Sequence, residues 1–391
     1  MDQVLVERHY PHTPTYNETR FGTYLSVAQQ SYTPEELISM VLEHAKDITL
    51  AYGEEKGSQL GIIQDVVLTV PSFATQHERR ALLDAAALAD LNVLALIDET
   101  VAAALHYGMD KMEDPPKTIL FYNLGASSLQ VAIVKFMSYP IKESKYAKEK
   151  IVGGFEVLAK TWDATFGGQA IDQVIVNHLA NEFNAKLTDG SNVRTDARAM
   201  AKLRIQANKV KHVLSANSEI PIYIDSLFHD TALSSHMTRP QLERLCADLM
   251  ERAVIPIQTA MAMANITTVD EIELIGGGMR VPMVQEQILK LLQVETLGLH
   301  INSDESMALG AAFHGANIST AFKVRHVGMT DINPFSVAIQ LDDDADWSKQ
   351  ATMFKANGKL GVKKTIAFTH DQDVHCAIDY EASDVLPVGT E

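Results

Sequence analysis

Apolar residues gather in short runs that alternate with helical patterns in the first part of the chain. Residues 65–70 form a β-branched run closed by Pro71, and residues 92–97 form a second apolar run. Each run precedes an alanine- and leucine-rich segment with helical spacing, at 74–90 and 99–107. Continuous apolar runs are typical of strands buried on both faces, and this alternation favours a parallel sheet covered by helices. The pattern predicts an α/β fold.

The clearest helix start in the sequence lies at residue 33. Thr33 can cap a helix with its hydroxyl, Pro34 suits the first helical position, and two acidic residues follow in the first turn. These features predict a helix from Pro34 to about Tyr52. Residues 1–33 carry no helical period and predict irregular chain or an edge strand.

A different texture begins after Thr118. The apolar runs 119–122 and 130–134 flank a loop of small residues, 123–128, which predicts a β-hairpin with a wide turn. Helical patterns then return, and the next predicted elements are helices at 170–185, 195–215 and 239–264, a strand at 271–275, and helices starting at Pro282 and Ser303.

Beyond Phe322 the pattern becomes β-like. Strands are predicted at 336–340 and 365–369, with acidic and glycine- or lysine-rich turns between them. Residues 323–391 therefore look like a separate, incomplete β unit.

Composition narrows the classes of function. The 391 residues are 46% hydrophobic, which is enough for substantial cores, and the length favours two or three domains. The 33 basic and 50 acidic residues give a net charge of −17, the wrong sign for coating nucleic acid or an anionic membrane. No run of about eighteen apolar residues occurs, so no membrane span is predicted. We therefore expect neither nucleic acid nor a membrane as a partner.

Metal and disulfide chemistry find little support in the sequence. Cys246 and Cys376 are the only cysteines, and they lie far apart without a C-x-x-C neighbour. The 14 histidines show no metal-ligand spacing. We predict no protein metal site.

Three glycine-containing turns lie between strand-like and helical or strand-like segments, at 123–128, 166–168 and 276–280. Glycine allows backbone amides to turn toward phosphate oxygens, and a helix start adds partial positive charge. One such turn alone is more often an ordinary tight turn, but the three together favour a polyphosphate site.

A polar face on the predicted helix 195–215 adds a second kind of evidence. Arg204, Asn208, Lys211 and Ser215 recur at intervals of four, three and four residues and therefore share one face. Such a face is either a solvated helix surface or, beside glycine turns, an edge that hydrogen-bonds a nucleoside.

Several longer motifs resemble the nucleotide-binding domain of the heat shock protein 70 superfamily, over about residues 30 to 322. They are Asp65–Pro71, Glu78–Arg80, Asp98–Gly108, Ile275–Pro282 and Asn302–Ala312. Within the superfamily, Lys211–Asn217 and Leu245–Leu249, together with a divergent phosphate loop, are most similar to the large hypoxia-upregulated, glucose-regulated chaperones of the endoplasmic reticulum.

The resemblance implies an actin-like (ribonuclease H-like) two-lobe ATPase fold that clamps ATP or ADP with Mg²⁺ between its lobes. It implies lobe I over 1–136, lobe II over 137–302, a helix returning to lobe I over 303–322, and the start of a peptide-binding β domain over 323–391. The family's opening hairpin, with its Asp-x-Gly-Thr-Thr loop, has no counterpart in residues 1–33. We therefore expect an N-terminally incomplete fold followed by an incomplete β domain, from a truncated fragment or a degenerate copy.

The family's site residues can be carried over to matching positions. Glu99 matches the carboxylate of the hydrolytic site, and Asn123 stands where the family has an aspartate that organises magnesium. The implied nucleotide-binding residues come from the second phosphate loop, the turn before residue 170, the polar helix face, the adenosine turn and an acidic position near the cleft floor: Gly125, Ala126, Ser127, Ser128, Gly167, Gly168, Asn208, Lys211, His212, Ser215, Gly276, Gly277, Arg280 and Asp304.

Departures from the family pattern bear on activity. Mg²⁺ prefers anionic oxygen ligands, so the neutral Asn123 predicts weakened magnesium binding. Phosphoryl transfer depends on positioning and charge neutralisation, so the absent hairpin and Asn123 together predict weak or no ATP hydrolysis. Asn208, where an acid is usual, and His212, where an arginine usually stacks, lower the expected affinity for adenine. The sequence leaves enzymatic activity open.

Two functions of different classes fit these residues. The first is an ATP-driven chaperone for unfolded polypeptide clients, with lobe rotation as its switch. The second is a nucleotide exchange factor or holdase-type module that acts on a partner chaperone of the same superfamily without its own ATPase cycle, and the neutral Asn123 favours it. A sugar or acetate kinase would share the fold, but no candidate catalytic base lies in a substrate loop.

The resemblance also implies a compartment, the lumen of the endoplasmic reticulum. Residues 1–20 lack the apolar centre of a secretory signal, so the cytoplasm is the expected compartment if the chain is complete.

Overall fold

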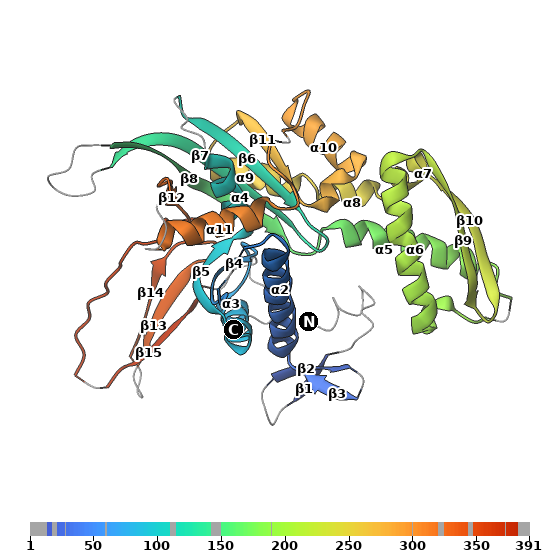
Figure 1. Cartoon of the computed structure of the whole chain (residues 1–391), viewed down its shortest axis with the longest axis horizontal. Helices are drawn as coiled ribbons and strands as arrows, with labels where there is room; N and C mark the ends of the chain where they lie inside the picture. Colours follow the sequence, from blue (N-terminus) through green and yellow to red (C-terminus); the bar gives the residue numbers. More distant parts are fainter. Residues whose placement is uncertain are drawn as a thin grey trace.

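The computed structural model describes residues 14–17, 22–27, 29–58, 61–109, 115–141, 150–188, 190–298, 300–319, 324–342, 347–371 and 373–381. Its body is a five-stranded mixed sheet with helices on both faces, and smaller units extend from this body (Figure 1). Among the described helices, none joins the length and apolar character that crossing a lipid bilayer demands.

The central sheet has the strand order β11-β6-β7-β8-β12. Its strands are β6 (Lys117–Leu124), β7 (Leu129–Ile141), β8 (Lys150–Asp163), β11 (Glu271–Ile275) and β12 (Gly328–Thr330). Strands β6, β7 and β8 form an antiparallel meander, whereas β11 runs parallel to β6 and β12 runs parallel to β8. The inner strands are rich in β-branched and aromatic residues, as expected for strands buried on both faces.

Alternate residues of β6 enter two different hydrophobic cores. Leu120, Tyr122 and Leu124 belong to the larger core on one face, whereas Ile119 and Phe121 belong to the smaller core on the other. The two-residue period of a strand thus fills both sides of the sheet. The larger core includes residues of α5 (Gly168–Asn184) and α9 (Ile255–Met263), and the smaller core includes residues of α4 (Glu99–Gly108) and α11 (Ser306–Ile318).

A second, parallel sheet consists of β4 (Asp65–Val70) and β5 (Asn92–Asp98), joined by the crossover helix α3 (Gln76–Leu88). Within the described part of the chain, β4 pairs with β5 alone. Helix α2 (Pro34–Glu55) packs against α3. Threonine and glutamate side chains form a capping box at the start of both helices, which satisfies backbone amides that would otherwise lack partners.

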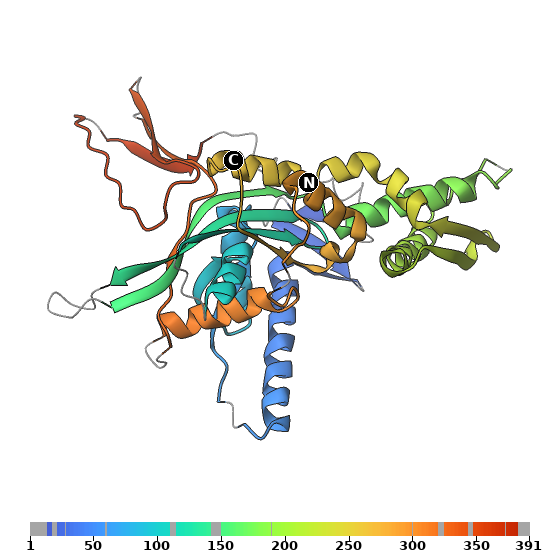
Figure 2. The same ribbon diagram turned by 90° about the horizontal axis from the view of Figure 1, so that it is seen from above.

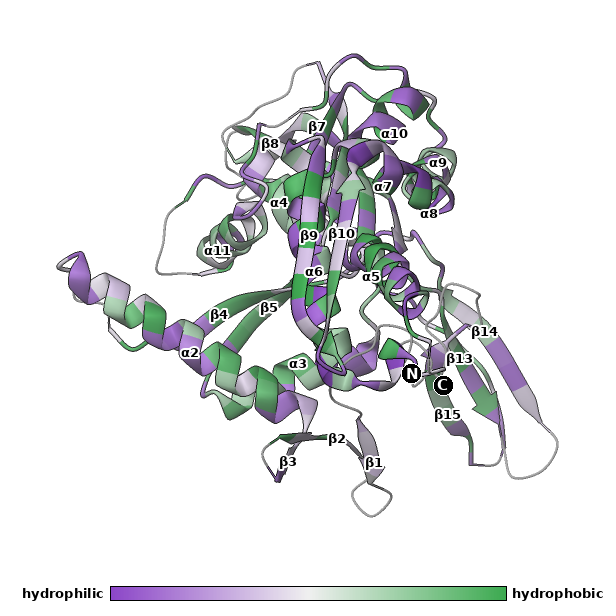
Figure 3. Cartoon of the chain, turned by 90° about the vertical axis from the view of Figure 1, so that its right-hand side faces the viewer, coloured by the Kyte–Doolittle hydropathy of each residue, from purple (hydrophilic) through white to green (hydrophobic). Residues whose placement is uncertain are grey.

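Helix α2 projects away from the central sheet (Figure 2). Its outer part carries polar and apolar residues together (Figure 3), and Val41, Ile48 and Tyr52 are more than half exposed, at 67%, 56% and 59%. The chain before α2 forms a small antiparallel sheet of β1 (Thr15–Asn17), β2 (Gly22–Val27) and β3 (Gln30–Tyr32).

Another unit extends beyond the end of α5 (Figure 1). It contains the 3₁₀ helix η1 (Val193–Thr195), α6 (Ala197–Ala216), the hairpin of β9 (Glu219–Phe228) and β10 (Thr231–Thr238), and α7 (Arg239–Leu245). The chain returns through α8 (Ala247–Glu251) and α9 to β11, followed by the 3₁₀ helix η2 (Gly277–Arg280) and α10 (Pro282–Leu292). The larger hydrophobic core runs through these elements without a break.

The last unit is a three-stranded antiparallel sheet, with β13 (Val337–Asp342) between β14 (Ser348–Phe354) and β15 (His375–Tyr380). The backbone amide of Gln76 donates to the Tyr380 hydroxyl at 2.7 Å. The Phe335 ring lies between those of Trp162 and Tyr380, with centroids 5.6 and 5.2 Å away. A cavity of about 580 Å³ separates this sheet from α3 and β5.

A buried cation joins the segment before β13 to the rest of the molecule. The Lys160 side chain is 1% exposed and forms ion pairs with Asp98 and Asp331. Burial raises the pKa of Asp98, but Lys160 and then Arg79 outweigh this and hold it below its usual value. Burial raises the pKa of Asp331 above its usual value, although Lys160 opposes the shift.

Several sequence predictions are confirmed. Helix α2 begins at Pro34 with the expected cap and ends three residues later than expected. Strands β4 and β5 are parallel, the 123–128 loop joins two antiparallel strands, and β11 occupies the predicted 271–275. Strand β4 is only half-buried for most of its length, and Val70 at its end is its one buried residue.

Other predictions were wrong or incomplete. The single helix expected at 239–264 is divided into α7, α8 and α9, and Pro256, in the first turn of α9, favours a new start there. Residues 365–369 form no strand, because the partner of β13 is β15 instead. The sequence-based predictions also missed β8, β9, β10, β12, β14 and β15.

Two expected boundaries fall within structural elements. Position 136 lies inside β7, which continues to Ile141. After residue 322, β12 pairs with β8 of the central sheet before the chain enters the sheet of β13, β14 and β15.

Candidate nucleotide site

The candidate site begins where two parallel neighbours end. Strands β6 and β11 run in the same direction, with Asn123 opposite Ile275, so the loops that follow them leave from one edge of the sheet. The Gly276 backbone has φ +83°, and a Cβ there would lie 2.4 Å from the Leu124 carbonyl oxygen. Glycine is required at this position on both counts. The turns at 125–128 and 276–280 are therefore held together by close backbone packing.

The start of α5 packs against the same loop. The Gly125 amide donates to the Ser128 carbonyl at 3.0 Å, and the Gly168 amide donates to the Gly125 carbonyl at 3.0 Å. A Cβ on Gly167 would lie 2.5 Å from the Ala126 carbonyl oxygen, so only glycine allows this approach. Ala126 and Ser127 remain exposed at the tip of the loop.

Lys211 connects α6 to these turns. Its Nζ donates to the Gly168 carbonyl at 3.0 Å and to Asp172 Oδ2 at 2.8 Å, and its side chain is 11% exposed. Asn208 Nδ2 also donates to Asp172 Oδ2, at 3.1 Å. Burying an ammonium group is costly unless a carboxylate and further hydrogen bonds compensate, so Asp172 fixes the position of Lys211.

The turn after β11 meets both α6 and the segment before α11. Ser215 lines a small pocket together with Val281 and Pro282. Arg280 forms an ion pair with Asp304, and the Gly276 amide donates to the Ser303 carbonyl at 3.2 Å. Ser215, the Gly276–Arg280 turn and Asp304 therefore lie next to one another.

Glu99 is the carboxylate at the other side of the site. Its Oε2 accepts hydrogen bonds from Gln130 Nε2 at 2.6 Å and Asn123 Nδ2 at 3.1 Å. Burial raises the pKa of Glu99, although the hydrogen bonds from Gln130 and Asn123 act in the opposite direction. Glu99 is thus a half-buried carboxylate supported by two neutral amides and by no cation among these contacts.

The expected set of site residues divides into two groups. Backbone packing or side-chain bonds bring together Glu99, Asn123, Gly125–Ser128, Gly167, Gly168, Lys211, Ser215, Gly276, Arg280 and Asp304. Asn208 is exposed but shares Asp172 with Lys211, so it borders the same group, whereas His212 lies exposed on α6. A Cβ on Gly277 would meet nothing closer than 3.9 Å, so packing does not require glycine there.

Sequence reasoning missed two residues of the site. Gln130 is 1% exposed and joins Glu99 to the loop before α3, because its Oε1 accepts from the Ser72 amide at 2.8 Å. The polar Gln130 within an otherwise apolar strand could have indicated a site residue. Asp172 fixes Lys211, but a single acidic residue in the first turns of α5 does not by itself indicate a site residue.

The described residues fit a nucleotide better than they fit a magnesium ion. The loop tip at Ala126 and Ser127 is exposed, and Gly168, which packs on this loop, accepts from the fixed ammonium group of Lys211; such a glycine-containing loop beside a cation suits phosphate oxygens. A magnesium site needs anionic oxygens with free lone pairs. Here Asn123 is neutral, and it directs its amide nitrogen toward Glu99.

A mixed α/β structure with glycine turns around one sheet edge is compatible with nucleotide-binding proteins of several folds, and the family match selects among them. The chain matches the sequence model of the Hsp70 protein family over residues 3–384, and it belongs to that family. Membership implies an actin-like two-lobe ATPase fold. Members of the family bind ATP or ADP with Mg²⁺ and act on unfolded polypeptides.

The curated relatives agree with this family. The chain is 36% identical to Heat shock 70 kDa protein 17 of Arabidopsis thaliana over 366 residues, which cover 92% of this chain and 41% of the relative. It is 35% identical over 368 residues to Hypoxia up-regulated protein 1 of Xenopus tropicalis, covering 90% of this chain and 55% of the relative. The human Hypoxia up-regulated protein 1 is 34% identical over 393 residues, which cover 95% of this chain and 38% of the relative. The chain thus spans between about two fifths and just over half of these relatives' length.

Proposed function

We propose that this chain binds ATP or ADP as the nucleotide-binding part of an Hsp70-type chaperone that acts on unfolded polypeptides and hydrolyses ATP weakly or not at all. The single observation that carries the proposal is the contact of the Asn123 amide with Glu99. In this arrangement Asn123 neutralises no magnesium charge, and Glu99 uses one oxygen to accept two amide donors. Binding needs the loop amides and Lys211, whereas hydrolysis also needs an ordered metal and water.

The proposal assigns the phosphates to the 125–128 loop, Gly167 and Gly168. The nucleoside is assigned to the α6 face with Asn208, His212 and Ser215, and to the Gly276–Arg280 turn with Asp304. We further propose two lobes, one around β4 and β5 and one around the central sheet, with their boundary before β6 rather than at residue 136. The sheet of β13, β14 and β15 is assigned to the peptide-binding unit.

Equilibrium binding and single-turnover hydrolysis test this proposal on the same preparation. Fluorescent ATP and ADP should bind in a saturable way, and unlabelled nucleotide should displace them. Replacement of the exposed loop residue, Ser127→Glu, should weaken binding by charge repulsion, whereas Ser191→Glu, outside the site, should not. Absence of saturable binding by the folded chain refutes the proposal. Rapid hydrolysis, comparable to that of an active Hsp70 measured in parallel, refutes the statement about activity.

A second candidate function is nucleotide exchange or holdase activity on a partner chaperone of the same superfamily. The neutral environment of Glu99 favours it, because a docking module needs no metal-dependent chemistry. The discriminating measurement is ADP release from a partner Hsp70 with and without this chain. Faster release without turnover by this chain supports exchange, whereas unchanged release together with suppressed aggregation of an unfolded client supports a holdase.

The compartment follows from the same family reasoning. We propose the lumen of the endoplasmic reticulum, on the similarity to the hypoxia up-regulated proteins. Imaging of the full-length gene product in its own cells tests this, and a purely cytoplasmic signal contradicts it.

A further inference from the structure

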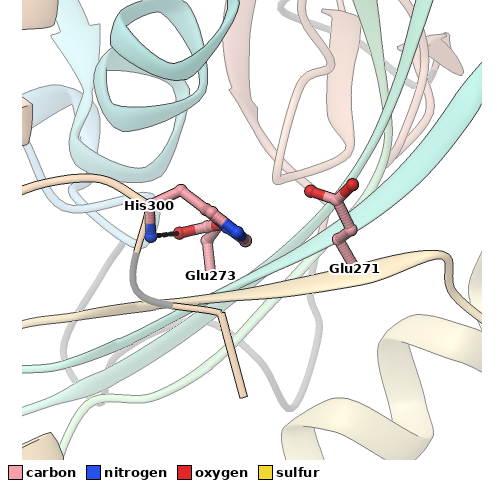
Figure 4. Close-up of side chains that lie close together, drawn as sticks. All are labelled: Glu271, Glu273 and His300. Carbon is pink, nitrogen blue, oxygen red and sulfur yellow. Dashed lines mark hydrogen bonds and ion pairs between the residues drawn. The ribbon is translucent and has the colours of Figure 1, made fainter. Parts of the chain in front are cut away.

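Three side chains with metal-binding atoms lie together at β11, two of them on the strand itself and one on the segment that follows α10. Glu271 and Glu273 are two residues apart on one strand, so their side chains share a face of the sheet. His300 follows on the next segment and turns back toward Glu273 (Figure 4). Each residue offers one ligand atom, and these atoms all lie within 4.8 Å of one another.

Glu273 is an unusual residue for its position. Its side chain is 0% exposed, in a strand whose neighbours are apolar. One carboxylate oxygen accepts from the His300 backbone amide at 3.1 Å, and the other contacts His300 Nδ1. Among the described residues, His300 provides the ion pair recorded for Glu273. Burying a carboxylate is costly unless cations or hydrogen-bond donors compensate for it, and the ligand atoms of Glu271 and His300 both lie within 4.8 Å of Glu273.

A glycine keeps this place open. Gly298 pairs with Glu273 in an isolated bridge, and its amide donates to the Ile272 carbonyl at 2.8 Å. A Cβ on Gly298 would lie 2.8 Å from Glu273 Oε1 and 3.1 Å from His300 Nδ1. Any other residue would place its Cβ against this contacting pair, so Gly298 leaves room beside both ligand atoms.

The site is also accessible. The His300 side chain is 59% exposed, so an ion can reach it from solvent. Glu271 is 25% exposed, and it accepts from the Tyr107 hydroxyl at 2.5 Å and from Lys117 Nζ at 2.8 Å. An incoming cation would compete with Lys117, whose side chain is 39% exposed, for the Glu271 carboxylate.

We propose that Glu271, Glu273 and His300 bind one divalent cation of the zinc class. A set of one imidazole nitrogen and two carboxylate oxygens suits Zn²⁺, which accepts nitrogen and oxygen ligands at distances of about 2.0–2.2 Å. Magnesium and calcium prefer oxygen ligands throughout, so the imidazole disfavours them. Small rotations of the three side chains bring their ligand atoms from within 4.8 Å to the separations that one ion requires.

The bound ion would join two segments that lead to the nucleotide turns. Strand β11 ends at Ile275, directly before Gly276, and the segment after His300 leads to Ser303, whose carbonyl accepts from the Gly276 amide. A cation between Glu273 and His300 therefore holds these segments in register. This role is structural and needs no nucleotide, so it stands or falls apart from the proposed function.

Isothermal titration calorimetry of the metal-free chain with Zn²⁺, without nucleotide, tests the site. We expect one bound ion per chain. His300→Ala should raise the dissociation constant for Zn²⁺ by about tenfold or more, since even the residues that support metal ligands contribute that much affinity. The matched controls His326→Ala and Glu295→Gln alter an exposed histidine and an exposed acid and should leave the constant unchanged.

Further measurements keep the test decisive. Glu273→Gln retains the shape of the buried side chain, and circular dichroism reports whether that variant folds; His300 is exposed, so its variant should fold in any case. In the parent, Zn²⁺ should shift the imidazole resonances of His300 and raise the melting temperature. The proposal is overturned if the parent binds no Zn²⁺, if His300→Ala binds as tightly as the parent, or if Mg²⁺ displaces Zn²⁺ at equal concentration.

Discussion

Replacing Asn123 by aspartate tests the central feature of the candidate site. Asn123 Nδ2 lies 3.1 Å from Glu99 Oε2 and donates a hydrogen bond to it. In Asn123→Asp the donor becomes a second carboxylate at about the same distance. Two unit charges at that distance repel by about 5 kcal/mol at an effective dielectric constant of about 20. This value is an upper bound, because Glu99 is half-buried and partly screened by water, and because it can take up a proton.

Protonation of Glu99 limits the cost further. Taking a carboxyl of ordinary pKa to its neutral form at pH 7 costs about 3.7 kcal/mol, and each unit of pKa increase removes about 1.4 kcal/mol of that cost. Burial already raises the pKa of Glu99. We therefore expect Asn123→Asp to lower the free energy of unfolding by about 1–3 kcal/mol at pH 7 without metal.

The pH dependence gives the sign of this effect. A carboxyl whose folded-state pKa is raised binds its proton more tightly in the folded than in the unfolded state. Its unfavourable contribution is therefore absent below the unfolded-state pKa and grows as pH rises through the folded-state pKa. The stability difference between parent and variant should be small near pH 4 and reach its full size at neutral pH.

Urea unfolding at several pH values, with and without Mg²⁺, measures these effects. The control Asn123→Ser removes the amide donor without adding charge, so the difference between the two variants isolates the repulsion. Mg²⁺ should stabilise Asn123→Asp more than the parent, because two adjacent carboxylates attract a divalent ion. Equal stability of Asn123→Asp and Asn123→Ser at neutral pH, with no effect of Mg²⁺, would refute the reasoning.

Three further predictions concern the packing around the site. Gly276→Ala should lower the free energy of unfolding by about 2 kcal/mol or more, since it adds a Cβ at positive φ; Gly277→Ala, with open space, is the matched control in chemical denaturation. Lys211→Met should cost about 2 kcal/mol or more by leaving Asp172 without its cation, and should weaken nucleotide binding measured by fluorescence. Lys160→Met should cost about 3–5 kcal/mol in thermal unfolding, and adding Asp331→Asn should recover part of the loss; no recovery would contradict the role of the ion pair.

The elements that the sequence predicted well are those whose signals are local. The cap at Thr33, the β-branched run before Pro71 and the small-residue loop after β6 each depend on a few neighbouring residues. The missed strands have different origins. Strand β15 pairs with β13, which lies more than thirty residues earlier in the chain, so its signal is not local. In β9, Ile220, Ile222 and Ile224 alternate with exposed residues, and β10 follows after two residues; this is a local hairpin signal that the sequence analysis did not use.

The same distinction applies to the sites. Glycine turns could be recognised individually, but their convergence depends on β6 and β11 being parallel neighbours, although the two strands lie far apart in the sequence. The pairing of Lys211 with Asp172 places a residue that seemed to belong to a solvated surface in a buried position. The Glu273–His300 pair has no sequence signal at all, because only the fold brings the two residues together.

Adjacent carboxylates at the start of α4 show how local contacts assign different roles. Asp98 faces two cations, Lys160 and Arg79, and its pKa is held low, so it remains charged and fixed. Glu99 faces two neutral amides, and its pKa is raised, so it is the one of the pair that a proton or a cation can readily approach. Because the two residues share one peptide bond, a shift of α4 moves both of them. The contacts of Asp98 with the Lys160 ion pair therefore help to fix Glu99 in the candidate site.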